Sequence, residues 1–552
     1  MRTPPAERPP SFARVAAEIR AELRERAELP AGETSFSLPR THRLQRDTLR
    51  TLLDLYERYG SVFTIRSFHR RLVGLIGPQA NHFVTVGGAE NFSYRKGMFG
   101  EHLTPLIGDG LITTDGEYHD RARRIMMPAF HRRRMDAAVA VMLDESERAL
   151  ADWQQGDAVD VYEWIRGLAM TIAMRALVGL DPREAGIGQE AAVLFERALA
   201  YTNTEIWAML LRGPGTPWAR MQTARADLDK IIATEICRRR LDGHGGEDIL
   251  SMLIEAQDES DDSDAARSRF TDIELRDQLM HMLFGGHDTT SSTLAFLLYE
   301  LARHPAALAR LVDEQDAVLG GRAPTAEELV NGLPQLTMAI EETLRLYPPV
   351  WFGPRMVVKT FEFAGHTIPA GTHVFHTSWV THHLPEVFPD PEAFVPERFT
   401  PEARRSIPRG GYIPFGGGQR ICIGKRFGQL VVAAVATTLL QRFRVELRAG
   451  YELRIEKLPT LSPGNGMPMV VRERRDVARV GQSARVGESA PVGESARVGE
   501  SGRVGESGRV GESARVGESA RVGESARVGE SAAGVDPSGT LASGLAPSAA
   551  QA

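Results

Sequence analysis

The chain is poor in cysteine. Its 552 residues include only two, Cys237 and Cys422. Two cysteines exclude a disulfide scaffold and a cysteine-rich zinc or iron–sulfur module. Such low usage fits a reducing compartment, and we therefore expect a cytoplasmic protein.

The chain also lacks an excess of one charge and any long apolar run. It has 66 Lys and Arg residues against 72 Asp and Glu, which leaves a net charge of −6. This balance gives no reason to expect nucleic acid or an anionic membrane as a partner. No uncharged stretch reaches the roughly 20 apolar residues of a membrane span. Residues 1–10 lack the apolar segment of a signal peptide. We therefore expect no membrane anchor.

Composition divides the chain into three zones. Residues 1–44 form an arm rich in Pro, Arg and Glu, in which the amphipathic stretch Phe12–Leu29 predicts a short helix. Residues 45–475 hold nearly all the long apolar patterns and predict one domain. In residues 476–552, the unit Arg-Val-Gly-Glu-Ser-Ala repeats with a period of six between Arg479 and Ala532.

The repeat has one valine in each unit as its only apolar anchor. That cannot offset a backbone entropy cost of about 1–2 kcal/mol per residue, and we predict a disordered tail. A left-handed parallel β-helix is the alternative, because an aliphatic residue at every sixth position is typical of that fold.

The middle zone predicts a mainly α fold with small β-sheets. Apolar residues recur with helical period in seven segments: Ala137–Trp153, Val161–Val178, Gln222–Leu241, Thr271–Leu301, Ala306–Leu319, Leu336–Leu346 and Phe427–Phe443. Strand-like runs are short and cluster early and late: Val62–Ile65, Leu72–Ile76, Met356–Val358, Phe361–Phe363 and His373–Phe375. The turn residues Pro463–Gly466 predict a terminal hairpin. A core of roughly 430 residues exceeds the usual single-domain size, which a large central cofactor would explain.

The segment Gly410–Gly428 carries the strongest chemical signal. Three glycines, Gly416 to Gly418, allow a close backbone approach. Cys422 follows them, just before a predicted helix whose dipole and nearby cations favour thiolate over thiol. A haem needs just one protein ligand, and a lone thiolate suits it. The alternative is a small buried hydrophobe, which is the role we expect for Cys237.

Polar residues interrupt the predicted helix Thr271–Leu301. Residues 285–293 read Gly-Gly-His-Asp-Thr-Thr-Ser-Ser-Thr, which costs on the order of 3–4 kcal/mol of helix propensity. One interpretation is a helix end, with Asp288 as the N-cap of a second helix. The other is a local opening where hydroxyls and a carboxylate handle protons and water.

Glu342 and Arg345 are three residues apart on the predicted helix Leu336–Leu346, so they meet on one face. As an exposed pair they would contribute a few tenths of a kcal/mol, on the order expected at a surface.

These segments together resemble the cytochrome P450 family of haem-thiolate monooxygenases over residues 45–475. The stretch from Phe415 to Gly424 fits the signature F-x-x-G-x-R-x-C-x-G. Gly285–Thr290 fits the family's A/G-G-x-D/E-T-T/S motif. The family also carries E-x-x-R followed by P-E-R-F, which match Glu342, Arg345 and Arg398.

The resemblance implies the P450 fold, with a long central helix over a haem b and small β-sheets. Cys422 would then be the axial iron ligand in a loop that Phe415 and Gly424 complete, with Phe415 packed beside the sulfur. The haem propionates would be bound by Arg420, His119, Arg123 and Arg355. Many members have Trp where this chain has His119, a mild departure because bacterial members often have His.

The resemblance also assigns roles outside the cofactor loop. Asp288 would relay protons from bulk water, and Thr289 would lie beside the distal oxygen site. Glu342, Arg345 and Arg398 would form a buried structural brace behind the haem loop.

The implied activity is insertion of one oxygen atom of O2 into a small lipophilic substrate, by hydroxylation or epoxidation. No nucleotide-binding G-x-G-x-x-G follows a strand, so we expect electrons from a separate ferredoxin and ferredoxin reductase. One alternative is a peroxide-driven peroxygenase, which the acid–alcohol pair of Asp288 and Thr289 disfavours. Another is a haem-binding sensor or carrier without turnover.

Two further clusters leave alternatives open. His373, His376, His382 and His383 could suggest zinc, but none of their spacings is a helical i,i+4 pair and no cysteine is near. The basic run His131–Arg134, with Lys425 and Arg426, is either a docking face for an acidic ferredoxin or solvated charge.

Overall fold

The computed structural model describes residues 12–24, 28–183, 186–204, 206–242, 248–257 and 269–474. The chain divides into two compact units, Met1–Glu488 and Ser489–Ala552, and every described residue belongs to the first. The repeats of the predicted tail lie outside the described residues, so their disorder stays a prediction.

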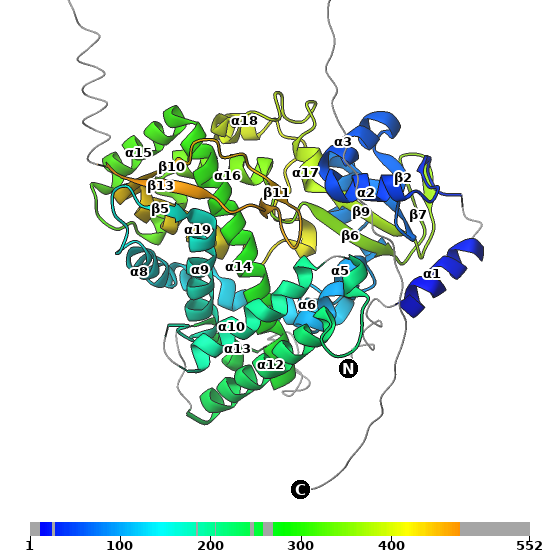
Figure 1. Cartoon of the computed structure of the whole chain (residues 1–552), viewed down its shortest axis with the longest axis horizontal. Helices are drawn as coiled ribbons and strands as arrows, with labels where there is room; N and C mark the ends of the chain where they lie inside the picture. Colours follow the sequence, from blue (N-terminus) through cyan, green and yellow to red (C-terminus); the bar gives the residue numbers. More distant parts are fainter. Residues whose placement is uncertain are drawn as a thin grey trace, which may run out of the picture. The chain divides into compact units, whose positions relative to one another are not determined.

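Helices make up most of the described chain, and all seven predicted helices are present with shifts of a few residues at their ends (Figure 1). In chain order the helices are α1 (Phe12–Arg24), α2 (Leu38–Arg46), α3 (Thr48–Tyr59), α4 (Pro78–His82), α5 (Met98–Ile107), α6 (Gly116–Met126), α7 (Arg132–Ala137), α8 (Val139–Ala149), α9 (Val161–Ala173), α10 (Ile187–Leu199), α11 (Ile206–Met209), α12 (Pro217–Asp242), α13 (Ile249–Glu255), α14 (Asp272–Arg303), α15 (Pro305–Leu319), α16 (Pro334–Leu346), α17 (Ser378–His382), α18 (Pro401–Arg404) and α19 (Lys425–Arg442). Within the described ranges, none of these helices has the length and apolarity needed to cross a membrane.

The strands are short and form four small sheets, as predicted for this fold class. They are β1 (Gly32–Glu33), β2 (Val62–Ser67), β3 (Arg70–Leu75), β4 (Phe92–Ser93), β5 (Ala158–Asp160), β6 (Phe352–Val357), β7 (Phe361–Phe363), β8 (His366–Ile368), β9 (His373–Thr377), β10 (Phe443–Leu447), β11 (Ile455–Glu456), β12 (Ser462–Pro463) and β13 (Pro468–Glu473). The largest sheet has the order β1-β2-β3-β9-β6-β4 and joins the early and late strands.

The predicted terminal hairpin is wrong. Residues Pro463–Gly466 do turn the chain, but the two strands they join do not pair with each other. β12 pairs with β11, whereas β13 pairs with β10 and β5. The turn forms as its residue types predict. Which strands pair depends on tertiary contacts, which a local pattern does not contain.

The central helix α14 positions the rest of the fold. It begins with a capping box in which Thr271 and Glu274 satisfy each other's backbone amides. Helices α9, α16 and α19 pack against it, and Figure 1 shows α14 running through the middle of the helical layers. Its segment Leu294–Leu298 is fully buried, which fixes the helix along its length.

The helix α14 is continuous from Asp272 to Arg303, so it neither ends at Gly286 nor opens there, and a role of its carboxylate and hydroxyls with protons stays a prediction. Three hydroxyls bond backward along the helix: Thr289 Oγ1 donates to the Gly285 carbonyl at 2.6 Å, Ser291 Oγ to the His287 carbonyl at 2.8 Å, and Thr293 Oγ1 to the Thr289 carbonyl at 2.8 Å. Such bonds satisfy the hydroxyls within the helix, so their polarity does not require an opening. Ser292 Oγ donates to the Leu461 carbonyl instead.

The structure brings the three brace residues together in a buried cluster. Glu342 and Arg345 have fully buried side chains and are 2.7 Å apart. Arg345 also donates to three backbone carbonyls, among them that of His382 at 2.9 Å. Arg398 Nε lies 3.4 Å from Glu342 Oε1, an ion-pair distance without hydrogen-bond alignment. Removing one partner of such a buried cluster typically costs about 3–5 kcal/mol.

Buried histidines make the fold sensitive to acid. Burial lowers the pKa of seven of the described histidines. The pKa falls to about 4 for His102, His281 and His373 and to about 3 for His376 and His383, and it also falls for His119 and His382. A histidine of the unfolded chain has a pKa of about 6.5. Between these values the unfolded state binds protons that the folded state cannot, so acid favours unfolding.

We therefore expect the free energy of unfolding to be level near pH 7 and to fall as the pH drops from 6.5 toward 4. Each residue contributes up to about 1.4 kcal/mol per pH unit. Denaturant titrations at several pH values measure this slope. His373→Phe should reduce it by about one proton. A stability that stays constant between pH 7 and pH 5 would show that these histidines ionise within the folded state.

Candidate functional site

A cavity of about 580 Å³ lies between α14 and the cysteine loop. Its walls are largely apolar, with side chains such as Phe99, Leu103 and Met282. All nine residues predicted for cofactor binding and catalysis line it, namely His119, Arg123, Asp288, Thr289, Arg355, Phe415, Arg420, Cys422 and Gly424. The sequence therefore identified one continuous site from segments that are far apart in the chain.

Cys422 contributes a thiol to the cavity wall. The exposed part of its side chain faces this cavity, and protein surrounds the rest. Its amide donates to the Phe415 carbonyl at 2.9 Å, which fixes the loop. The predicted preference for thiolate is not found. Burial raises the pKa of the thiol, and the Gly424 amide, Arg123 and Lys425, which lower it, do not compensate.

The glycines before Cys422 do permit a close approach, and the partner is Thr85, through both its backbone and its side chain. A Cβ atom on Gly418 would lie 2.2 Å from the Thr85 carbonyl oxygen, and one on Gly417 would lie 2.9 Å from Thr85 Oγ1. Gly418 also has a φ of +60°, which L side chains rarely adopt. The glycines therefore seat the cysteine loop against residues 83–87.

Two arginines share one aromatic ring at the cavity. The Arg355 guanidinium lies 3.3 Å from the centre of the Tyr94 ring, and that of Arg420 lies 4.3 Å from it. Arg420 also donates to Asp115 Oδ1 at 2.7 Å and to the Thr114 carbonyl at 2.6 Å. Neither Tyr94 nor Asp115 was predicted from the sequence, because neither follows a spacing that links it to these arginines.

The residues present fit a haem b. Among the described residues, Cys422 is the one cysteine that lines the cavity, and a haem needs a single thiolate from the protein. Four basic residues, His119, Arg123, Arg355 and Arg420, line the same cavity and suit two propionates. Arg355 Nε is buried and makes no hydrogen bond to the described residues, so it has the capacity to bind an anion there.

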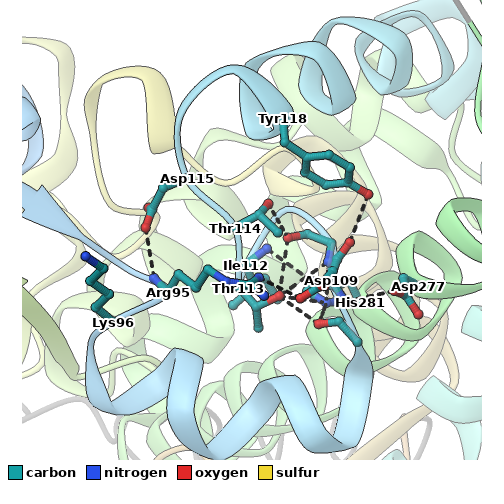
Figure 2. Close-up of polar contacts among 12 residues, drawn as sticks. Arg95, Lys96, Asp109, Ile112, Thr113, Thr114, Asp115, Tyr118, Asp277 and His281 are labelled. Atoms are coloured by element: carbon teal, nitrogen blue, oxygen red, sulfur yellow. Dashed lines mark hydrogen bonds and ion pairs between the residues drawn. The ribbon is translucent and has the colours of Figure 1, made fainter. Parts of the chain in front are cut away.

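The loop that carries one cavity wall is held by side chains of α14 (Figure 2). Asp277 Oδ2 accepts from the Asp109 amide at 2.8 Å. His281 Nδ1 accepts from the Ile112 amide at 3.1 Å, and its Nε2 lies 3.1 Å from the Gly110 amide and 3.2 Å from the Gly108 carbonyl. Burial lowers the pKa of His281 to about 4, so the ring is neutral near pH 7 and keeps a lone pair for these amides. These contacts fix Leu111 and Ile112 at the cavity.

Helix α1, from the predicted arm, forms another part of the wall. Arg14, Val15 and Glu18 line the cavity. Glu18 bonds Arg70 at 2.6 Å, and Arg70 in turn bonds the fully buried Glu101 at 2.8 Å. No function was predicted for the arm, since amphipathic periodicity shows that a helix has an apolar face but not what covers that face.

Asp288 sits at the cavity in a network that also reaches the surface. Arg166 Nη1 donates to Asp288 Oδ1 at 2.6 Å. Burial favours the protonated acid, but the contacts from His287 and Arg166 outweigh it and lower the pKa of Asp288. A Cβ atom on Gly285, one turn earlier, would meet nothing within 4 Å, which leaves open space beside Thr289.

The structure also describes the histidine cluster and most of the basic face. No three His, Cys, Asp or Glu side chains of the described residues are grouped to hold a metal ion, so the histidine cluster gives no zinc site. On the basic face, Arg132 pairs with Glu327, and Arg426 pairs with Asp136 at 2.5 Å. Arg134 is exposed. The side chain of Arg133 lies outside the described residues.

Comparisons with known proteins agree with this site. The family model named Cytochrome P450 matches residues 35–466. Cyclooctat-9-en-7-ol 5-monooxygenase of Streptomyces melanosporofaciens is 34% identical over 69% of this chain and 82% of its own length. Putative cytochrome P450 136 of Mycobacterium tuberculosis is 32% identical over 77% of this chain and 84% of its own length.

Solved structures match as well. The retinoic acid-bound cyanobacterial CYP120A1 superposes with a TM-score of 0.72 at 28% identity, over 81% of this chain and 100% of that one. The heme domain of cytochrome P450DA has a TM-score of 0.73 at 26% identity, over 81% and 98% of the two chains. With a single cysteine facing a cavity that fits haem b, these matches show that the chain belongs to the cytochrome P450 family of haem-thiolate monooxygenases.

Proposed function

We propose that the chain oxidises a small lipophilic molecule with dioxygen, through hydroxylation or epoxidation, and that Asp288 and Thr289 supply the protons. The observation that carries this proposal is that the Cys422 thiol and the Asp288–Thr289 pair line one cavity with apolar walls. Bound haem would activate dioxygen there and insert one of its atoms into the substrate.

The chain's own residues hold and charge this site. Cys422 would give up its proton and bind the iron, since a coordinated thiol is deprotonated. His119, Arg123, Arg355 and Arg420 would bind the propionates, and the contact of Arg420 with Asp115 would keep its guanidinium in place. The brace of Glu342, Arg345 and Arg398 would hold the segments behind the loop.

Asp288 and Thr289 would act on protons. The lowered pKa of Asp288 keeps it ionised at neutral pH, so it accepts a proton from solvent and passes it on. Thr289 uses its own hydroxyl proton on the Gly285 carbonyl, which leaves its oxygen lone pairs to accept a hydrogen bond in the cavity. A peroxide-driven enzyme or a haem carrier would not need this pair.

The substrate class follows from the walls and the relatives. Phe99, Leu103 and Met282 give the cavity an apolar surface. One relative is named for its action on a cyclic alcohol, and one structural neighbour holds retinoic acid. These names support a lipophilic substrate with few polar groups.

Cys422→Ser should abolish the red-shifted Soret band that thiolate-bound haem shows in the reduced carbon monoxide form, because a serine oxygen does not replace the thiolate. The spectrum of purified protein measures this. Cys237→Ser, at a cysteine on α12, is the matched control and should keep the band. A wild-type protein that is folded and haem-loaded yet lacks the band would contradict Cys422 as ligand.

Thr289→Ala should lower the yield of product per dioxygen consumed by about tenfold or more, a typical loss for proton-transfer groups, and should raise hydrogen peroxide release. Thr171→Val on α9 removes a hydroxyl with the same backward bond, to Gly167, away from the cavity. That control should leave the yield unchanged. Equal yields in the two variants would contradict a role for Thr289.

We propose a ferredoxin and its reductase as electron donors and the basic face around Arg134 as the docking surface. Arg426, next to the cysteine loop, is tied through Asp136 to α7, which carries Arg134. Arg134→Glu should raise the ferredoxin concentration for half-maximal reduction several-fold, whereas Arg50→Glu on α3 should not. Faster turnover with hydrogen peroxide than with any ferredoxin system would favour the peroxygenase alternative.

The cytoplasmic location stays a prediction.

A further inference from the structure

Helix α5 brings one polar side chain to the cavity from a face that is otherwise apolar. Phe99, His102 and Leu103 are spaced i, i+3 and i+4, so they lie on one face of the helix, and all three line the cavity. Nδ1 of His102 is enclosed and makes no hydrogen bond to the described residues. Nε2 has no hydrogen-bond partner among them either. The ring is therefore available to a ligand in the cavity.

His102 is a neutral imidazole near pH 7. Burial, together with the nearby charges of Arg70 and Arg14, lowers its pKa to about 4. A neutral ring has one N–H donor and one nitrogen lone pair. Polar groups that are removed from water and left without a partner destabilise the protein. A ligand that supplies the missing hydrogen bond would therefore bind more tightly than one that does not.

The arginines beside His102 already have partners. Arg70 contacts Glu18 at 2.6 Å and Glu101 at 2.8 Å. Arg14 contacts the same two side chains. Each guanidinium thus faces two acidic side chains, so neither arginine is left to bind an anionic ligand at this end of the cavity.

Glu18 makes this end of the cavity unfavourable for an acid. It lines the cavity, and its charge acts on the His102 ring. Burial opposes its ionisation, but the contacts from His69, Arg70 and Arg14 outweigh burial and lower the pKa of Glu18. The ionised side chain would repel the carboxylate of a ligand bound at His102. A neutral ligand group meets no such repulsion.

A hydroxyl group fits the His102 ring better than a ketone or an ether oxygen. A hydroxyl both donates and accepts, so it pairs with the ring whichever nitrogen carries the proton. A ketone or an ether only accepts. Phe99 and Leu103, on the same face of α5, provide apolar surface for the hydrocarbon skeleton that carries the hydroxyl.

We propose that His102 hydrogen-bonds the hydroxyl group of a lipophilic alcohol, so that the substrate is an alcohol and not a carboxylic acid; this inference rests on the proposed function. His102 is then a specificity-determining residue, and it holds the substrate at α5. One relative is named for its action on an alcohol, which agrees with this class. Retinoic acid, which a structural neighbour holds, is an acid, and its carboxylate would meet Glu18 here.

Spectral titration of the haem-loaded protein tests the proposal with three compounds of one ring size, cyclooctanol, cyclooctane and cyclooctanecarboxylate. The shift of the Soret band gives a dissociation constant for each. In His102→Phe, the ratio of the constant for the alcohol to that for the hydrocarbon should rise about fivefold or more, because one buried hydrogen bond is lost. The hydrocarbon itself should bind as it does to the wild type. His102→Gln retains an N–H group and should restore the wild-type ratio.

His373→Phe is the matched control. His373 lies beside the same arginine, Arg70, but is not one of the cavity-lining residues, so its loss should leave the ratio unchanged. The same ratio in His102→Phe as in the wild type, or an equal rise in both Phe variants, would overturn the proposal.

The wild type provides a second test, because it should bind the carboxylate more weakly than the alcohol. A carboxylate that binds as tightly as the alcohol, or a wild type that binds the hydrocarbon and not the alcohol, would also overturn the proposal. These constants do not depend on turnover. Failure of the proposed function would appear separately, as a wild type that binds the alcohol but forms no product from dioxygen.

Discussion

A thiol at the wall of a buried cavity loses its proton only when a cation binds the sulfur, and the site of this protein depends on that constraint. Burial raises the pKa of the Cys422 thiol despite the nearby Arg123 and Lys425. The nearby positive charges therefore offset part of the effect of burial on the pKa of the thiol without ionising it. Iron would supply the missing positive charge, and the loop needs only to hold the sulfur in position, which it does through the Phe415 carbonyl and the tight seat on Thr85.

The same principle orders the opposite side of the cavity. Asp288 is nearly as buried as the thiol, but there the protein provides its own compensation through Arg166 and His287. The Cys422 thiol thus depends on the cofactor for its ionisation, whereas Asp288 is ionised through contacts within the protein. This difference separates metal binding from proton handling within one cavity.

The sequence predicted the elements that have an unbroken local pattern. Seven helices follow from apolar periodicity, and the short strands follow from β-branched and aromatic runs. The local reading failed where partners lie elsewhere in the chain. The turn at Pro463–Gly466 does not say which strands pair. The hydroxyls of Thr289, Ser291 and Thr293 bond within their own helix, which a count of propensities cannot show. The cavity residues were found because the family motif names them, whereas Arg166, Asp115 and His281 have no such spacing and were found only in the structure.

Helix α1 lies before residue 35, where the match to the family model begins, yet it contributes Arg14, Val15 and Glu18 to the cavity wall. The residues that match the family model and the residues that enclose the cavity therefore have different boundaries in this chain. A protein trimmed to residues 35–466 would keep every residue named for chemistry. It would lose the part of the cavity wall that α1 forms. The buried carboxylate of Glu101 would keep its contact with Arg70 and lose its contact with Arg14. The shape of the cavity thus depends in part on a segment that lies outside the matched residues.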